Sequence, residues 1–271
     1  QYYYHAWSSE IIYFLNQQRS LLALQKAEKM KKQAFADRYP YGIFSCIRTM
    51  GHIYKSRGNF DLSAQYYQEA LDYMLKNMPD QDPSQLYSSL AEYYRNTQKD
   101  YATALDYCEK ALKSAKTERN IAQAMIEKCL VLFRQGRIDE FNDCYKEAVQ
   151  MADRCKLSAS VSLLIAHISK NILDKQYEQA HAHADQLSEE GLQQHAYIYE
   201  CAKDYPNAIK YLKKYHQQLD STNNLLQLSD IAELNTQIGA ERLKMENIQA
   251  TSRYRITLFS IVTGFLLLSL L

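Results

Sequence analysis

The chain has 271 residues, a length that fits one large domain or two small ones. Its 32 basic and 31 acidic side chains nearly cancel, whereas a nucleic-acid-binding domain needs an excess of Lys and Arg to neutralise phosphates. Seven Gly and four Pro are far fewer than the average usage of about 7% and 5%, and this scarcity predicts a mostly helical chain.

One pattern recurs along the chain. A small residue is followed three positions later by a larger apolar one, as in Gly51 and Tyr54, and this pair predicts a first helix. A short polar turn follows, and then a second helix whose apolar residues are spaced three and four apart, as in Ala104, Cys108 and Ala111. Four stretches show the pattern clearly: Met50–Leu71, Leu90–Leu112, Lys128–Val149 and Ala196–Leu219. Their turns are expected to end at Phe60, Tyr101, Ile138 and Tyr205.

Two further units keep the apolar spacing but have lost other parts of the pattern. The first unit contains Phe14, Ala23, Ala27 and Met30, and the second contains Tyr177, Ala180, Ala184 and Leu187. The small-residue positions Gly51, Ala91, Cys129, Ile168 and Ala196 are unevenly spaced, which predicts longer helices or looser linkers in the middle of the array. We therefore expect about six helix pairs over residues 1–222.

These units resemble the tetratricopeptide repeat, whose pattern contains L-G-x2-Y followed by A-x3-F. Met50-Gly51-x2-Tyr54 matches the first part with Met in place of Leu, and Ser63-x3-Tyr67 and Ala104-x3-Cys108 match the second loosely. The family's Trp is absent from all units and its closing Pro is mostly missing. The resemblance implies an all-α solenoid of tetratricopeptide type, which binds peptides or proteins on the concave face lined by the first helices.

Ten side chains are predicted to project from first helices onto that concave face. They are Arg48, His52, Lys55, Glu92, Arg95, Asn96, Phe133, Arg134, Tyr197 and Glu200. Arg48, Lys55 and Arg95 could clamp a ligand carboxylate, because guanidinium and ammonium groups donate charge-assisted hydrogen bonds. The alternative is that these charges form only a solvated face.

No catalytic motif and no cofactor-binding motif occurs in the sequence, so we expect this chain not to be an enzyme. His181 and Asp185 could share one helix face and hold a metal, but exposed polar side chains on a repeat helix explain them as well. The six Cys lack metal-site spacing and offer no disulfide framework, and we interpret them as small core residues, with disulfide bonds as the alternative.

Residues 223–255 are predicted to form one long connector helix. Ile231, Leu234, Ile238, Met245 and Ile248 recur at intervals near the coiled-coil period. The helix either packs back on the last repeat or pairs with a second copy through residues 225–255 to form a homodimer.

The run Ile256–Leu271 contains sixteen uncharged residues. Such a helix would be about 24 Å long, against about 30 Å for the hydrocarbon core of a bilayer. We expect the start of a transmembrane helix in a piece of a longer protein that begins before Gln1 and continues past Leu271. A hydrophobic helix that caps the solenoid is the alternative, although a cap should present a polar outer face.

The whole arrangement resembles bacterial membrane-tethered signalling proteins with N-terminal tetratricopeptide repeats. The resemblance lies in Asp37–Phe60 and Asp204–Asn224 and implies a sensor domain, most often of a histidine kinase, whose output module is not in this chain. It also implies an inner-membrane anchor and a periplasmic repeat domain, whereas Arg253 and Arg255 before the apolar run favour the cytoplasmic side. The alternatives are a membrane-anchored scaffold and a transcriptional regulator with a DNA-binding output.

Overall fold

The structure is a computed structural model that describes residues 2–157, 160–188, 190–228, 230–231, 247–248 and 251. All regular structure in these ranges is helical. The elements are α1 (Tyr2–Asn16), α2 (Ser20–Ala36), α3 (Pro40–Ser56), α4 (Phe60–Asn77), α5 (Ser84–Tyr93), the π-helical turn η1 (Tyr94–Gln98), α6 (Tyr101–Ser114), α7 (Glu118–Arg134), α8 (Ile138–Arg154), α9 (Val161–Leu173), α10 (Tyr177–Ala184) and α11 (Gly191–Cys201). Residues 205–228 are also helical, and we call residues 205–223 the terminal helix.

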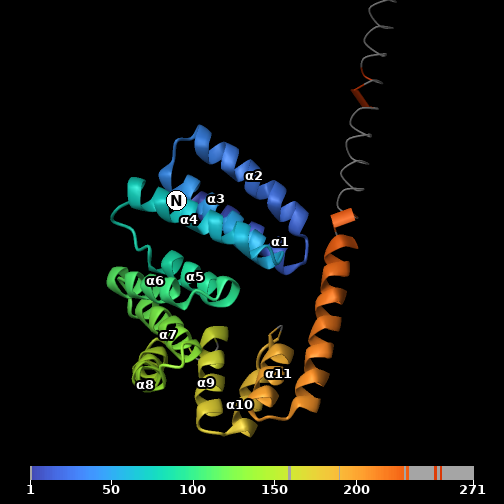
Figure 1. Cartoon of the computed structure of the whole chain (residues 1–271). Helices are drawn as coiled ribbons and strands as arrows, with labels where there is room; N and C mark the ends of the chain where they lie inside the picture. The colour runs from blue at the N-terminus through green and yellow to red at the C-terminus, as the bar shows by residue number, and fades with distance from the viewer. Residues whose placement is uncertain are drawn as a thin grey trace, which may run out of the picture. The chain divides into compact units, whose positions relative to one another are not determined.

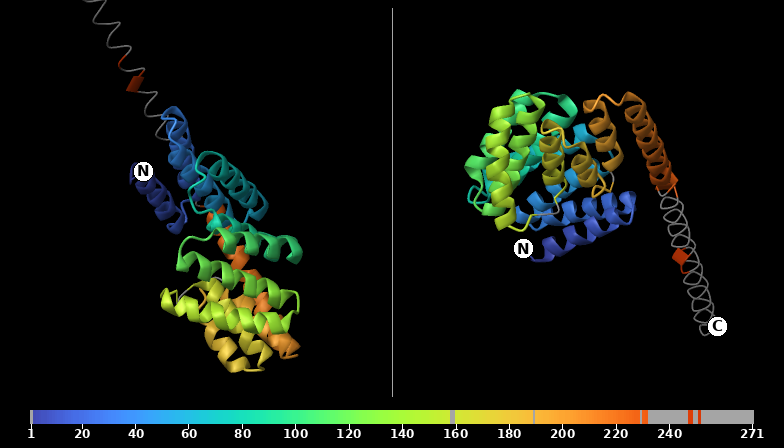
Figure 2. Two further views of the ribbon diagram at one scale, coloured as in Figure 1. Left: turned by 90° about the vertical axis from the view of Figure 1, so that its left-hand side faces the viewer. Right: turned by 90° about the horizontal axis from the view of Figure 1, so that it is seen from below.

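The chain divides into two compact units, Gln1–Asn223 and Asn224–Leu271. In the first unit each helix packs against the next, so that hairpins follow one another in chain order (Figure 1, Figure 2). The pairs are α1/α2, α3/α4, α5/α6, α7/α8, α9/α10 and α11 with the terminal helix. The prediction of an α-helical hairpin array of about six pairs is confirmed.

The second helices begin where the turns were predicted to end. α4 starts at Phe60, α6 at Tyr101 and α8 at Ile138, and the terminal helix starts at residue 205. Polar caps define several starts, since the Asn59 and Asp100 side chains each accept a hydrogen bond from a backbone N–H in the first turn. The first helix of a pair is followed within the turn by a residue with positive φ, such as Gly58 after α3 or Gly136 after α7, and this reversal lets the second helix fold back on the first.

Small residues set how closely the two helices of a pair approach. A Cβ added to Gly51 on α3 would lie 2.6 Å from the Tyr67 ring of α4, so any larger residue would push the helices apart. Ala104, Cys108 and Ala111 are completely buried along α6, as the apolar stripe predicted. Ala180 and Ala184 on the short helix α10 are also completely buried, which confirms the second of the two degenerate units.

The uneven repeat length has a visible cause in the middle of the array. A linker over residues 78–83 separates α4 from α5, and η1 widens the end of α5 into a π-helical turn. The linker lengthens the spacing between the first helices α3 and α5, as the sequence predicted, whereas α5 and α7 begin 34 residues apart (84 to 118), the length of a regular repeat.

The predicted membrane segment lies entirely outside the described residues, and the connector helix lies mostly outside them. No helix in the described ranges is both long enough and apolar enough to span a bilayer. The predicted anchor, the coiled coil and the homodimer therefore stay predictions.

Candidate functional site

The first helices enclose a cavity of about 770 Å³ in the first compact unit. Helices α3, α5, α7, α9 and α11 all contribute to its lining, together with the start of α4 and one face of the terminal helix. First helices thus form the inner face of the array, as the resemblance to tetratricopeptide repeats implied. The polar residues used below are Lys55, Glu92, Arg95, Asn96, Lys99, Arg134, Ser162, Glu190, Gln193 and Gln194.

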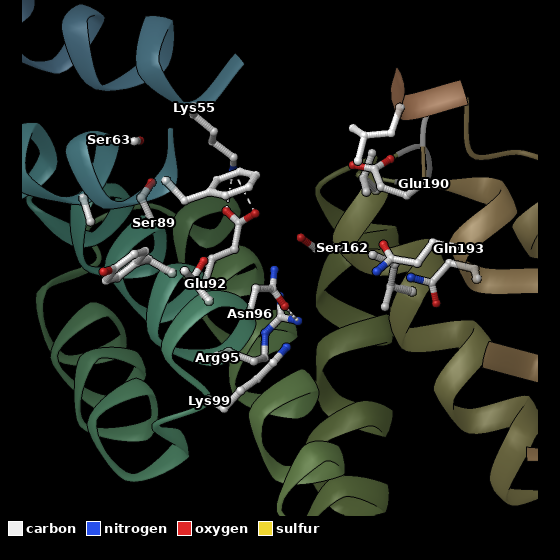
Figure 3. Close-up of a pocket in the computed structure, with 18 of the residues that line it drawn as sticks. Lys55, Ser63, Ser89, Glu92, Arg95, Asn96, Lys99, Ser162, Glu190 and Gln193 are labelled. Atoms are coloured by element: carbon white, nitrogen blue, oxygen red, sulfur yellow. Dashed lines mark hydrogen bonds and ion pairs between the residues drawn. The ribbon is translucent and has the colours of Figure 1, made fainter. Parts of the chain in front are cut away.

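Two walls face each other across this cavity (Figure 3). Lys55, Glu92 and Asn96 lie on the wall built by α3, α5 and η1. Ser162 and Gln193 lie on the opposite wall, built by α9 and α11. Both walls carry groups that donate and accept hydrogen bonds, which suits a ligand with a polar backbone.

An exposed ion pair lies at the α3 side of the first wall. The Lys55 ammonium is 2.6 Å from one carboxylate oxygen of Glu92, and it also donates to the other oxygen at 2.8 Å. Burial alone would lower the pKa of Lys55, but the charge and hydrogen bonds of Glu92 outweigh burial and raise that pKa. Lys55 therefore stays protonated, and its charge is balanced within the wall.

A buried polar network lies further along the same wall. The Arg95 guanidinium donates to Glu127 at 3.0 Å, and the second oxygen of Glu127 accepts from the Ser162 hydroxyl at 2.8 Å. Arg95 also donates to the Asn96 side chain at 2.7 Å, whereas the Nε of Arg95 has no partner among the described residues. Glu127 thus joins η1, α7 and α9, the inner elements of three successive hairpins.

Lys99 lies at the end of η1 and projects into the cavity (Figure 3). Its backbone is left-handed, with φ of 57°, and its N–H donates to the Tyr94 carbonyl across the π-helical turn. Burial and the charges of Arg134 and Arg95 lower the pKa of Lys99. No ion pair of Lys99 or Arg134 is found within the described ranges, so the two exposed cations form a positive patch in the lining.

Five of the ten predicted site residues line the cavity: Lys55, Glu92, Arg95, Asn96 and Arg134. The predicted carboxylate clamp is not assembled from them as expected. Lys55 and Arg95 already pair with carboxylates, and Arg48 does not line the cavity but places its guanidinium 5.4 Å from the Phe44 ring centre. Whether any of these residues binds a ligand stays a prediction.

The structure places the other predicted residues outside the lining. His52 meets the Tyr67 hydroxyl at 3.0 Å through its Nδ1. Phe133 packs against the Phe141 ring in the core, and Tyr197 lies under the Arg134 guanidinium at 4.8 Å. Glu200 is exposed and is not part of the lining.

Sequence reasoning missed several lining residues, above all Lys99, Ser162, Glu190 and the face of the terminal helix. One feature of the sequence indicates the polar contacts between hairpins. The paired residues are separated by 37 positions for Lys55 and Glu92, 32 for Arg95 and Glu127, and 35 for Ser162 and Glu127, which is about one repeat. Polar residues of complementary character one repeat apart on first helices indicate contacts between neighbouring hairpins.

The two candidate metal residues, His181 and Asp185, each contact His195. The His181 and His195 rings stack at 4.9 Å, and Asp185 lies 3.1 Å from His195. His183 stacks on a different ring, that of His167, at 5.0 Å. Within the described part of the chain no three His, Cys, Asp or Glu side chains are arranged to hold a metal ion.

Comparison with known families supports the hairpin class. A sequence model of the tetratricopeptide repeat matches residues 48–82, which include the second half of α3 and all of α4. The fold and the site thus define an array of tetratricopeptide-like hairpins around an inner cavity. Comparison with curated protein sequences gives no match.

Three solved structures have a similar fold. The Rap conjugation gene regulator of the plasmid pLS20, in complex with the Phr* peptide, is 15% identical with a TM-score of 0.64, over 79% of this chain and 61% of that one. NprR in complex with its cognate peptide NprX is 16% identical with a TM-score of 0.53, over 84% of this chain and 71% of that one. PilW, a widely conserved type IV pilus biogenesis factor, is 13% identical with a TM-score of 0.53, over 84% and 99%. At these identities the likeness is one of fold.

Proposed function

We propose that the cavity binds a short peptide segment, in an extended conformation, that carries a carboxylate. The observation that carries the proposal is a cavity of about 770 Å³ with polar side chains on two facing walls. Ligand-binding pockets usually measure about 300–1,000 Å³. The Asn96, Gln193 and Gln194 amides each offer a donor and an acceptor, the combination that a peptide backbone needs.

The carboxylate of this ligand lies between Lys99 and Arg134 in our proposal. Lys55 and Arg95 are balanced by Glu92 and Glu127, which leaves Lys99 and Arg134 as the lining cations without an ion pair among the described residues, against one further lining carboxylate, Glu190. The lowered pKa of Lys99 reflects partial burial and repulsion by Arg134 and Arg95, and the negative charge of a bound anion would offset both effects. Two of the similar folds hold peptides, Phr* and NprX, which supports the choice of a peptide over other anions.

A peptide-capture experiment tests the proposal. A library of short random peptides is prepared twice, once with free C-terminal carboxylates and once with C-terminal amides, and each is passed over the immobilised full chain. We expect enrichment of peptides with a free carboxylate or an acidic side chain. Replacement of Lys99→Ala with Arg134→Ala should weaken binding of an enriched peptide roughly tenfold or more, because charge-assisted hydrogen bonds are lost.

The matched control replaces two exposed lysines outside the lining, Lys113→Ala with Lys146→Ala, and removes the same charge. The control should bind as the wild type does. No enrichment from either library, or equal losses in both double variants, would overturn the peptide site. Capture of folded proteins but of no peptide would favour the scaffold alternative.

We further propose that this domain is the input part of a membrane-anchored signalling protein, such as a sensor histidine kinase, with the repeats on the periplasmic side. The apolar run at 256–271 supports the anchor. The resemblance of Asp37–Phe60 and Asp204–Asn224 to such proteins supports the periplasmic side, whereas Arg253 and Arg255 favour the cytoplasmic side. Peptide binding would change the hairpin array, and the connector over residues 223–255 would pass that change to the membrane.

Cell fractionation tests the anchor. The full chain should sediment with membranes, whereas a chain shortened after Arg255 should stay in the aqueous fraction. Recovery of the full chain in the aqueous fraction would remove the anchor. Reporter fusions that are active on only one side of the membrane would then decide between the periplasmic and cytoplasmic placements.

A further inference from the structure

Two cysteines meet between α7 and α8, which lie side by side as a hairpin (Figure 1). The sulfur atoms of Cys129 and Cys144 are 2.8 Å apart, closer than the van der Waals contact of two sulfur atoms, although both are present as free thiols. A disulfide bond measures about 2.05 Å. A small shift of the two side chains would therefore bring the sulfurs to bonding distance. No other two thiols in the described part of the chain lie within hydrogen-bonding distance.

The surroundings give the two thiols different characters. Cys129 is fully buried, whereas Cys144 is half-buried and within reach of solvent. The hydrogen bond from Cys129 lowers the pKa of Cys144, and the charge of Lys128 acts in the same direction against the effect of burial. The same hydrogen bond and burial raise the pKa of Cys129. Cys144 is therefore the thiol that forms a thiolate more readily, and the thiolate is the nucleophile in disulfide exchange.

We propose that Cys129 and Cys144 form a reversible disulfide that ties α7 to α8. The oxidant is a second disulfide, carried by a small molecule or a protein. The Cys144 thiolate attacks one sulfur of that disulfide, forms a mixed disulfide and releases the other sulfur as a thiolate. Cys129 then gives its proton to the released thiolate and attacks the Cys144 sulfur, which expels the second thiolate. Two cysteine thiols lose two electrons and two protons, and the oxidant gains both to become two thiols.

The link has a structural consequence for the cavity, whatever the cavity binds. Helix α7 carries Glu127, which joins Arg95 and Ser162, and it also carries Arg134. A disulfide would hold this helix against α8 and limit its movement relative to the neighbouring hairpins. Because the cysteines are 15 positions apart, the closed loop should raise the thermal midpoint Tm by roughly 5–10 °C.

Peptide mapping of the full chain tests the proposal directly. The protein is incubated with glutathione disulfide, free thiols are alkylated, and the chain is cut with trypsin without reduction. We expect one cross-linked species that joins peptides 129–134 and 138–146, and its disappearance when dithiothreitol is added. The oxidised protein should show the higher Tm.

Two variants separate the pair from the other thiols. Cys155→Ser replaces a half-buried cysteine at the end of α8 and should keep both the cross-linked peptide and the Tm shift. Cys144→Ser should lose both. If a variant fails to fold, the presence or absence of the cross-linked peptide in the wild-type digest tests the proposal by itself. Glutathione left on Cys144 as a mixed disulfide, alkylation of both thiols, or a cross-link to Cys108 in place of Cys144 would overturn the proposal.

Discussion

The two ion pairs on the cavity wall differ in how far water reaches them. The side chains of Lys55 and Glu92 are 42% and 32% exposed, whereas those of Arg95 and Glu127 are 6% and 8% exposed. Each pair joins the inner elements of neighbouring hairpins at a separation of about one repeat. The same kind of contact therefore occurs in two solvent environments within one wall.

The contrast in exposure indicates which charges can respond to a ligand. Removing one member of a buried pair leaves an uncompensated charge in a medium of low dielectric, and this is costly. An exposed pair exchanges its partner for water at little cost. Arg95 and Glu127 are therefore expected to hold the hairpins together, whereas Lys55 and Glu92 can separate when a ligand enters. Four predictions follow from this contrast.

The largest effect is expected from breaking the buried pair. Glu127→Ala should reduce the free energy of unfolding by about 3–5 kcal/mol, because Arg95 and the Ser162 hydroxyl lose their common acceptor. Urea denaturation followed by circular dichroism measures the change. Glu140→Ala, which breaks the exposed pair with Arg137, should leave the unfolding midpoint unchanged. A loss in Glu127→Ala no larger than in this control would contradict the prediction.

Replacing both buried charges tests whether the pair itself is needed. The double variant Arg95→Met with Glu127→Leu should recover about 2 kcal/mol of the loss seen in Glu127→Ala, since apolar side chains of similar size often substitute for a buried ion pair. The same denaturation experiment measures this recovery. If the double variant is as unstable as the single one, the bonds to Asn96 and Ser162 matter more than the charges.

The region of the exposed pair should respond to pH through His52. Burial, together with the charges of Arg48 and Lys55, lowers the pKa of His52 to about 4, while an unfolded histidine titrates near 6.5. The unfolded chain therefore takes up the proton first as the pH falls. The His52 ring packs against Tyr67, but the residue as a whole is open to solvent, which screens its charge. Stability present above about pH 6.5 should therefore be lost between pH 6.5 and pH 4, by about 1 kcal/mol.

His52→Gln isolates this contribution, because glutamine does not titrate. Unfolding free energies measured at pH 7 and at pH 4 should differ less in His52→Gln than in the wild type. His5→Gln replaces an exposed histidine on α1, away from the cavity, and should keep the wild-type pH dependence. Identical pH profiles for all three proteins would contradict the assignment.

The smallest effect is expected from the exposed pair itself. Lys55→Met should change the free energy of unfolding by less than about 0.5 kcal/mol, and the change should shrink further in high salt. Denaturation at low and high salt measures it. A loss comparable to that of Glu127→Ala, or one that salt does not reduce, would show that the two pairs do not differ as their exposure indicates.

The sequence alone determined the helical hairpins of this protein and most of their boundaries. Phe60, Tyr101 and Ile138 were predicted as the ends of turns, and the second helices begin there. The stripe of Ala104, Cys108 and Ala111 was predicted from spacing and is completely buried. These features could be predicted because turns and amphipathic spacing depend on residues within a few positions of one another.

The tertiary structure alone decided which side chains meet. Phe133 and Arg134 are neighbours on α7, yet Phe133 packs in the core and Arg134 lines the cavity. Adjacent positions point about 100° apart on a helix, so a small change in how hairpins stack decides which of them faces inward. The partners of Lys55 and Arg95 and the contact of Cys129 with Cys144 lie on neighbouring helices. Such contacts depend on the distance and angle between packed helices, which local spacing does not specify.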